Sequence, residues 1–433
     1  MSARDTALAT LIACRRAQAW SDEALKQNLA RDRLDRRDAA LATRLVYGVQ
    51  QNRMLLDHWL SRFVRGRLSA LQPVVLDILR LAVYQLSFLD KIPSSAAVSE
   101  AVNQTRKYAN ARAAGLVNGV LRAMLRDPDA FRLPADLPTR YSHPAPLVEL
   151  LRENVGEQKL EPLLACHNAA PPTYVQVNPC RAVADEVRAE LEAEGYGVTA
   201  HPWLPGCFEL SGGSPEKSAA FRSGKIYVQD PAAKLAVRAA APQSGMDVLD
   251  CCAAPGGKSI SAAVCMENRG AIRSCDLYAH KLPLIEKSAQ RLGLACISVF
   301  RADASVPNPE WKDRFDLVLA DVPCSGLGVI RKKPDIREKD LAALAALPEV
   351  QARILAAQCG HVRPGGVLLY STCTVLRREN EAVVAEFLNT HPDYRAEAFS
   401  LPGEISAPDG FCTLLPCDQG TDGFFIAKLR RKS

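Results

Sequence analysis

The feature that most constrains the fold is a series of short apolar runs that alternate with helical stretches from Asp247 onward. Such alternation predicts a doubly wound α/β sheet whose parallel strands are buried on both faces. Strands are expected to end at or just before Asp250, Asp276, Asp303, Asp321 and Tyr370. The stretches 411–415 and 423–429 predict an antiparallel pair at one edge. Residues 241–433 are therefore predicted to form a Rossmann-like domain.

Two further domains are predicted ahead of this sheet. From residue 1 to about 135, apolar residues recur every three or four positions, which predicts an all-α bundle. Ser94 or Ser95 is expected to cap one of its helices. After a proline-rich connector, Leu147–Cys166 predicts one helix and Thr173–Asn178 a strand. We therefore expect an all-α domain at 1–140 and a small α+β connecting domain at 141–240.

The composition excludes several classes of protein. The 433 residues are 48% hydrophobic and 24% charged, as in ordinary globular proteins. No apolar run reaches transmembrane length, and charged residues interrupt the apolar N-terminus, so we expect a cytoplasmic protein with no membrane partner. The 14 cysteines form neither paired CxxC motifs nor Cys/His clusters. We therefore expect no disulfide framework and no metal site, and most cysteines should be small buried residues.

The positive charge is concentrated in the helical region. Residues 1–140 hold 22 Lys and Arg against 13 Asp and Glu, a balance of +9, whereas the remainder holds 32 against 35, a balance of −3. A basic module beside a near-neutral remainder predicts a polyanionic partner, most plausibly nucleic acid. The alternative is an arginine-rich helical surface that is merely solvated.

Two cysteines carry the clearest chemical signal. Cys324 lies in the loop that follows the apolar run 315–320, and Cys373 lies in the loop that follows the run 366–370. Ligands of an open α/β sheet bind outside the carboxyl ends of the strands, so both thiols should face one crevice. Two thiols in such a crevice predict nucleophilic catalysis; the alternative, that both are simply buried structural residues, fits strand-end loops poorly.

A glycine-rich turn at the end of another strand predicts a cofactor site. It comprises Cys252, Ala253, Ala254, Pro255, Gly256, Gly257 and Lys258. Glycine permits close approach of a ligand to the backbone, and the following helix offers free N–H groups. The turn matches neither the dinucleotide nor the Walker pattern. Asp276, at the end of the next strand, is suited to bind the ribose hydroxyls of a nucleoside cofactor, and Asp303 could bind its adenine edge.

Several strings resemble one enzyme family. DVLDCCAAPGGKS (247–259), DVPCSGLGVIRKKPDIR (321–337) and YSTCT (370–374) resemble motifs of the class I S-adenosylmethionine-dependent RNA (cytosine-C5) methyltransferases. VQDPAA (228–233) and LLPCDQGTDGFFIAKL (414–429) support this resemblance. The strings at 78–108 and 113–125 resemble NusB. A NusB-like domain joined to such a catalytic domain is the arrangement of the bacterial 16S rRNA methyltransferases of the Sun (Fmu) type.

The resemblance implies a mechanism and a set of roles. S-adenosylmethionine is the implied cofactor, and 16S rRNA, naked or in an early 30S particle, is the implied partner of a monomeric enzyme. Cys373 is the implied nucleophile toward C6 of cytosine, and Cys324 serves the elimination and release step. Asp321 is expected to bind the cytosine N3/N4 edge and also to lie at the cofactor, and Lys258 to assist. The target base has to be unstacked to reach such a pocket.

The chain departs from the family pattern at three positions. Gln176, Glu338 and Cys417 replace the more usual Arg, Trp and Gly. The first two are expected to soften RNA contacts. Four basic residues after the Cys324 loop are expected to contact phosphates: Arg331, Lys332, Lys333 and Arg337.

Two alternative functions stay open at this point. A DNA cytosine-C5 methyltransferase would use the Pro-Cys thiol, Cys324, as its nucleophile; the second thiol, Cys373, and the NusB-like module disfavour it. An RNA-binding assembly factor with a degenerate catalytic domain is the other. The intact residues of both cysteine loops and of the glycine-rich turn disfavour this second alternative.

Overall fold

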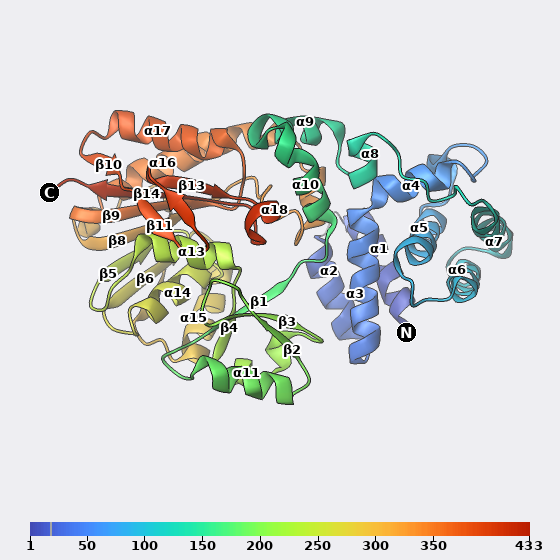
Figure 1. Cartoon of the computed structure of the whole chain (residues 1–433), viewed down its shortest axis with the longest axis horizontal. Coiled ribbons are helices and arrows are strands. Elements are labelled where there is room, and N and C mark those ends of the chain that lie inside the picture. The colour runs from blue at the N-terminus through green and yellow to red at the C-terminus, as the bar shows by residue number, and fades with distance from the viewer. Residues whose placement is uncertain (18–19) are drawn as a thin grey trace. The chain divides into compact units, whose positions relative to one another are not determined.

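A computed structural model describes residues 1–17 and 20–433 of the chain (Figure 1). The chain divides into two compact units. Unit 1 comprises residues 1–169 and 330–339, and unit 2 comprises residues 170–329 and 340–433. None of the described helices is long and apolar enough to span a bilayer. The predicted domain boundaries at 140 and 240 stay a prediction.

Unit 1 is helical, as predicted for the N-terminal region. Its long helices are α1 (Ala3–Ala17), α2 (Ser21–Asp32), α3 (Arg36–Gln51), α4 (Arg53–Ser61), α5 (Pro73–Phe88), α6 (Ser94–Tyr108), α7 (Ala111–Arg126), α9 (Ala145–Val155) and α10 (Glu157–Asn168). Its described residues also form three short elements: the 3-10 helix η1 (Leu68–Ala70), α8 (Leu137–Tyr141) and the 3-10 helix η5 (Pro334–Glu338). Apolar side chains from α1, α3, α4, α5 and α7 form its core, among them Leu8, Leu45, Leu56, Ile78 and Leu121, all fully buried. The three- and four-residue spacing of these side chains places them on one face of each helix, which is why the bundle forms.

Two local predictions for this unit are wrong. Ser94 does not cap a helix, because it is the first residue of α6 and Pro93 holds the cap position without a side-chain hydrogen bond. Leu147–Cys166 is not one helix. Gly156, with φ of +80°, separates α9 from α10, because its left-handed backbone ends the first helix and begins the second.

Unit 2 contains a small antiparallel sheet that precedes the main one. Its strands are β1 (Thr173–Val177), β2 (Gly197–Ala200), β3 (Cys207–Ser211) and β4 (Ile226–Val228), in the order β2-β3-β1-β4. Helix α11 (Ala184–Ala193) packs Val187 and Leu191 against one face. Asn178, just after β1, donates hydrogen bonds to the carbonyls of Gly224 and Leu292, which ties the small sheet to helix α15 (Leu282–Leu292).

The main sheet has five parallel strands and an antiparallel edge. The parallel strands are β9 (Val362–Thr372), β8 (Phe315–Asp321), β5 (Asp247–Asp250), β6 (Ala271–Asp276) and β7 (Ile297–Arg301), in that spatial order. At the β9 edge lies β14 (Phe424–Arg431), which pairs antiparallel with β9, β10 (Tyr394–Ala396) and β13 (Phe411–Leu414). The predicted strands and the predicted C-terminal pair are thus confirmed.

Helices cover both faces of this sheet (Figure 1). On one face α13 (Pro231–Ala240) and α14 (Gly257–Cys265) pack on alternate strand residues such as Val248 and Leu317. On the other face α16 (Leu347–Cys359) and α17 (Glu381–Thr390) pack on the intervening residues, such as Leu249 and Val318. The chain runs outward from β5 to β7 and then returns to β8 beside β5. Ligands of doubly wound sheets bind at such a reversal, outside the carboxyl ends of the strands.

Candidate active site

The two predicted thiols lie in contact at the carboxyl ends of β8 and β9. The Sγ atoms of Cys324 and Cys373 are 3.3 Å apart, and either thiol can donate the hydrogen bond between them. The contact follows from the sheet register, because β8 and β9 are parallel neighbours that pair Asp321 with Ser371. Cys324 lies three residues after the end of β8, and Cys373 directly follows the end of β9. Both side chains are only half-buried, so a substrate can reach them.

The two cysteine loops are held together by hydrogen bonds. The hydroxyls of Ser325 and Thr374 are 2.7 Å apart, and the N–H of Gly328 donates to the carbonyl of Cys373 at 3.0 Å. The N–H of Gly423 in turn donates to the carbonyl of Gly328 at 2.8 Å. The distance between the thiols is therefore fixed by backbone contacts on both sides.

A buried carboxylate that the sequence analysis missed supports the Cys324 loop. Glu379 accepts hydrogen bonds from the N–H of Ser325 at 2.8 Å and from the amide of Gln351 at 3.0 Å. The same amide donates to the carbonyl of Pro323. In the sequence, Glu379 follows two arginines and precedes a helix, where a carboxylate is typical of a solvated first turn. No local pattern therefore distinguishes it from a surface residue.

The surroundings of the two thiols differ, and their pKa values move in opposite directions. The hydrogen bond from Cys324 and the charge of Lys258 lower the pKa of Cys373 despite its burial. The hydrogen bond to Cys373, together with burial and the charge of Glu379, raises the pKa of Cys324 well above its usual value. Ionisation therefore favours Cys373 over Cys324, with Cys324 as the donor in that state.

A lysine–aspartate pair lies beside the thiols. Lys258 Nζ is 2.6 Å from Asp321 Oδ2, with 10% of the lysine side chain and 31% of the aspartate side chain exposed. The hydroxyl of Ser371 donates to Asp321 Oδ1 at 2.8 Å, and the ammonium lies over the ring of Phe424 at 4.9 Å from its centroid. Asp321 is therefore held by both oxygens. The structure brings Asp321, Lys258, Cys324 and Cys373 together, as the sequence predicted.

The glycine-rich turn joins β5 to α14. Gly256 has φ of +106°, and a Cβ there would lie 3.2 Å from Ile285 Cγ2, so a side chain would strain the turn. Because α14 begins at Gly257 without a side-chain cap, its first N–H groups are free to meet a ligand. Cys252, Ala253, Ala254 and Pro255 form the preceding stretch of the same turn.

Three aspartates lie at or just after the carboxyl ends of β5, β6 and β7. Asp276 accepts hydrogen bonds from the N–H groups of Ala254 at 3.3 Å and Tyr278 at 3.0 Å, one on each oxygen. Each oxygen keeps a lone pair for a further donor, which fits a ribose diol. Asp303 is exposed at the end of β7, and its Oδ1 accepts from the N–H and hydroxyl of Ser305, which lower its pKa. Asp250 is fully buried beneath the turn, and burial raises its pKa to about 6.

The predicted phosphate contact of Arg337 is wrong. This side chain belongs to unit 1, is 3% exposed, and donates its hydrogen bonds to carbonyl and amide oxygens inside that unit. Arg331 is also buried, Lys332 is half-buried, and Lys333 is exposed. The sequence showed four clustered charges but not that two of them point into a helical core.

One departure from the family pattern does not act as predicted either. Gln176 is fully buried and donates to Cys207 Sγ and to the carbonyl of Gln229, so it cannot contact RNA from this position. Glu338 is exposed and forms an ion pair with Arg53 at 2.7 Å within unit 1, so its predicted effect on RNA contacts stays a prediction.

Comparison with known proteins identifies the family. The family model described as 16S rRNA methyltransferase RsmB/F matches residues 237–430, the NusB family matches residues 1–126, and a ferredoxin-like domain of RsmF/B-like methyltransferases matches residues 143–215. The chain is 38% identical over 443 residues to the probable ribosomal RNA small subunit methyltransferase B of Bacillus subtilis, covering 100% of this chain and 99% of that protein. The chain belongs to the ribosomal RNA small subunit methyltransferase B family.

Other relatives agree with this assignment. The ribosomal RNA small subunit methyltransferase B of Vibrio cholerae is 35% identical, covering 93% of this chain and 92% of the relative. The crystal structure of PH0851 superposes with a TM-score of 0.80 at 25% identity and covers 98% of both chains. The structure of NSun6 from Pyrococcus horikoshii with SFG shares the fold, with a TM-score of 0.59 at 22% identity, covering 67% of this chain and 98% of that one. As a methyltransferase B family member, the chain is an S-adenosylmethionine-dependent enzyme that methylates small-subunit rRNA.

Proposed function

We propose that this methyltransferase transfers a methyl group to C5 of a cytosine in 16S rRNA through a covalent adduct between Cys373 and C6. The observation that carries the proposal is the pair of thiols 3.3 Å apart at the carboxyl ends of two adjacent parallel strands. The surroundings of the pair favour ionisation of Cys373 over Cys324. A thiolate next to a protonated thiol supplies both a nucleophile and a second group for a later step.

The thiolate of Cys373 starts the reaction. C5 of cytosine is a poor nucleophile in the aromatic ring. When the Sγ of Cys373 forms a bond to C6, the electron pair of the C5–C6 double bond becomes available at C5. S-adenosylmethionine held against the turn 252–258 would supply C5 with a methyl group from its sulfonium centre, whose carbon–sulfur bond would break. Covalent catalysis thus divides one difficult step into easier ones.

Cys324 serves the release of the product. After methyl transfer, the proton on C5 passes to a base, the C5–C6 double bond forms again, and the bond between C6 and Cys373 Sγ breaks. The thiolate of Cys373 is then restored. Cys324 is in contact with that sulfur and is held by the loop that Glu379 supports, so it is placed for this elimination step.

Asp321 and Lys258 prepare the base and the nucleophile. The carboxylate of Asp321 is positioned to accept from the N4 amino group of the cytosine, and its contacts with Lys258 and Ser371 hold it in place. Lys258 also favours the thiolate of Cys373 through its charge. Both side chains come from strand or helix ends rather than long loops, which keeps the geometry rigid.

Residues at the ends of β5, β6 and β7 would hold the cofactor. We infer that the turn 252–258 lies against it, that Asp276 binds its ribose hydroxyls, and that Asp303 binds near its adenine. The donor set fits, because the paired oxygens of Asp276 and the free N–H groups of α14 match a diol and a carboxylate. Asp321 lies next to both the thiols and this turn.

We further propose that unit 1 recruits the rRNA through phosphates. The +9 balance of residues 1–140 supports this role. A monomeric enzyme that acts on naked 16S rRNA or on an early 30S particle fits the proposal. The three domains are proposed to be an RNA-binding domain at 1–140, a connecting domain at 141–240 and a catalytic domain at 241–433.

Methyl transfer in vitro tests this function. Unmodified 16S rRNA is incubated with the full-length enzyme and S-adenosylmethionine, and bisulfite sequencing then identifies cytosines that resist deamination. We expect at least one resistant cytosine with the wild-type enzyme and none with Cys373→Ala. Methylation at another atom, or methylation of DNA in preference to RNA, would contradict the proposal.

A further inference from the structure

Ten residues that follow the Cys324 loop in the chain belong to the helical unit. Residues 330–339 pack within unit 1, whereas the residues on either side belong to unit 2. Ile330, Pro334, Ile336 and Arg337 are buried there. The chain therefore runs directly from the Cys324 loop into the helical unit.

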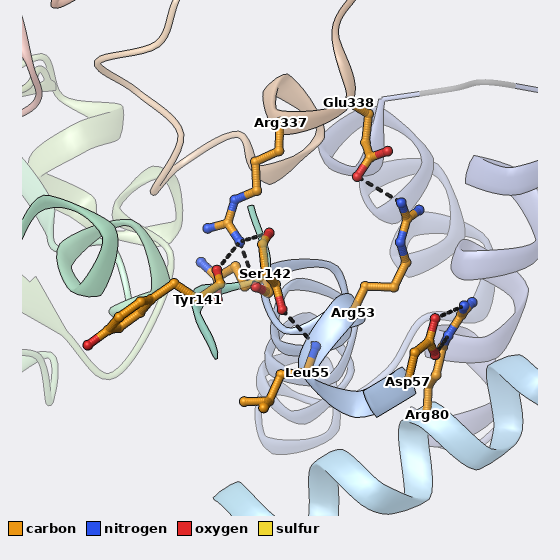
Figure 2. Close-up of polar contacts among 9 residues, drawn as sticks. Arg53, Leu55, Asp57, Arg80, Tyr141, Ser142, Arg337 and Glu338 are labelled. Atoms are coloured by element: carbon orange, nitrogen blue, oxygen red, sulfur yellow. Dashed lines mark hydrogen bonds and ion pairs between the residues drawn. The ribbon is translucent and has the colours of Figure 1, made fainter. Parts of the chain in front are cut away.

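Arg337 is the main anchor of this segment (Figure 2). One terminal nitrogen, Nη1, donates to the carbonyls of Gln51 at 2.6 Å, Ser142 at 3.3 Å and Tyr141 at 3.4 Å. The other, Nη2, donates to the carbonyl of His167 at 3.0 Å and to Asn168 Oδ1 at 2.6 Å. A single guanidinium thus joins three separate stretches of unit 1.

All of these acceptors lie at helix C-termini. Gln51 ends α3, Tyr141 ends α8 with Ser142 as its left-handed cap, and His167 lies in the last turn of α10. The last carbonyls of a helix have no partner within the helix, and they carry the negative end of its dipole. Arg337 satisfies the carbonyls of three helices with one cation, which offsets much of the cost of burying its charge.

The titratable neighbours of Arg337 stay compatible with a buried cation. Burial and the charge of Arg337 hold the pKa values of His143 and His167 well below the usual range, so both imidazoles are neutral. Burial lowers the pKa of Arg337 to about 9, with Glu338 acting in the opposite direction. The guanidinium therefore stays charged at neutral pH.

Further contacts hold the segment on both sides of this anchor. The N–H and hydroxyl of Ser21 donate to Asp335 Oδ2 at 3.0 and 2.6 Å. The amide of Gln51 donates to the carbonyl of Arg331 at 3.2 Å. Arg53 pairs with Glu338 at 2.7 Å, as Figure 2 shows. These contacts hold the segment in place from Arg331, its second residue, to Glu338, its ninth.

The covalent chain connects this anchored segment to the thiol pair. Gly328, whose N–H donates to the carbonyl of Cys373, is separated from Ile330 by Val329 alone. Any movement of the segment would reach Gly328 within two residues. Gly328 is one of the contacts that set the position of the two cysteine loops.

We propose that Arg337 is a positioning residue for methyl transfer, because it locks residues 330–339 into the helical unit and thereby fixes the downstream end of the Cys324 loop. The helical unit then acts on catalysis as well as on RNA recruitment. The part of this inference that concerns rate rests on the thiol chemistry proposed above.

Substitution of Arg337 tests the inference in the full-length enzyme. In Arg337→Ala we expect kcat for rRNA methylation to fall tenfold or more, while the KM for RNA and the Kd for S-adenosylmethionine change less than twofold. Trypsin should cleave after Lys332 faster than in the wild type, which reports release of the segment. Arg337→Lys keeps the cation and should restore kcat to at least threefold above that of Arg337→Ala.

Arg80→Ala is the matched control. Arg80 is a largely buried arginine of the same unit, but its guanidinium pairs with Asp57, as Figure 2 shows, rather than with the segment. It also pairs with Asp77. We expect this variant to lower the melting temperature while kcat stays within twofold of the wild type. Equal decreases of kcat in both variants would mean that rate follows stability, and would overturn the inference.

The reactivity of the Cys373 thiol can be measured even if the enzyme does not methylate cytosine. The pH midpoint for alkylation of Cys373 by iodoacetamide should rise in Arg337→Ala and stay unchanged in Arg80→Ala. If Arg337→Ala does not fold, Ser21→Ala removes one hydrogen bond to Asp335 and should raise trypsin cleavage and the alkylation midpoint to a smaller extent. A released segment with an unchanged alkylation midpoint would overturn the inference. Failure of the wild-type enzyme to methylate C5 would instead reject the proposed function.

Discussion

Lys258→Met tests how the protein activates Cys373. The lysine is nearly buried, lies 2.6 Å from Asp321, and lowers the pKa of Cys373, whereas the charge of Asp321 raises it. Removing the ammonium of Lys258 leaves the negative charge of Asp321, which raises the pKa of Cys373, without a neutralising partner. Removal of one nearby cation at a half-buried thiol raises its pKa by roughly one to two units, which is about 1.4–2.7 kcal/mol against the thiolate. Near neutral pH the thiolate fraction should therefore fall by about tenfold or more.

The pH dependence of alkylation measures the pKa of the Cys373 thiol directly. Iodoacetamide reacts with the thiolate, and peptide mass spectrometry separates Cys373 from the other cysteines. The wild-type reaction should have a midpoint below that of an ordinary cysteine thiol, because the folded structure lowers this pKa. In Lys258→Met the midpoint should move to higher pH, and the rate at its plateau should not fall, because a thiolate of higher pKa is intrinsically more nucleophilic. Adding Asp321→Asn to this variant should move it back toward the wild type.

A second buried lysine provides the control. Lys234 donates to the hydroxyl of Tyr227 at 2.9 Å in the same unit. Lys234→Met removes a buried ammonium without removing the partner of Asp321. An unchanged midpoint in Lys258→Met, or an equal shift in Lys234→Met, would refute the view that the lysine–aspartate pair tunes the nucleophile.

Three further outcomes are expected. Asp276→Ala should weaken binding of S-adenosylmethionine by tenfold or more in calorimetry, because charge-assisted hydrogen bonds to a diol contribute roughly 1.5–3 kcal/mol each; unchanged affinity in a folded variant would rule out this role. The pKa of buried Asp250 is raised to about 6, so its contribution to stability is present at low pH and is lost as pH rises through about 6. Asp250→Asn should therefore gain stability relative to the wild type, by up to about 3 kcal/mol, between pH 4 and 7 in denaturant titrations, and a pH-independent difference would contradict this. Replacing the exposed Arg65 and Arg67 by alanine should reduce the salt dependence of RNA binding by about 0.7–0.9 for each phosphate that is no longer neutralised, and an unchanged slope would mean that these arginines are only solvated.

The sequence predicted the elements that have a strong local signal. Most of the parallel strands were recognisable because they are short apolar runs that end at or near an acidic or polar residue. The adjacency of Cys324 and Cys373 followed from the rule that parallel strands present their carboxyl ends at one edge. For the same reason Asp321 and Lys258 were expected at the thiols, and the structure places them there.

Long-range partners could not be predicted in this way. Arg337 stands in a run of basic residues, which locally resembles a solvated phosphate contact, and only the tertiary structure shows three helix ends around it. Glu379 has the sequence context of a surface helix start, yet its carboxylate binds the Cys324 loop. The break at Gly156 was hidden because the apolar spacing continues on both sides. In each case the local sequence pattern indicates the type of secondary structure. It does not show which groups from other parts of the chain lie against it.

Trapping of the covalent intermediate tests the central claim most directly. In Cys324→Ala, Cys373 should still add to C6 of the cytosine and C5 should still receive the methyl group. The elimination step that releases Cys373 from C6 should stall. A slow band that contains both protein and 16S rRNA should therefore accumulate on a denaturing gel, and it should require S-adenosylmethionine. Cys373→Ala should show no such band and no methylation. Accumulation in Cys373→Ala but not in Cys324→Ala would reverse the two roles, and full turnover by both variants would contradict the covalent mechanism.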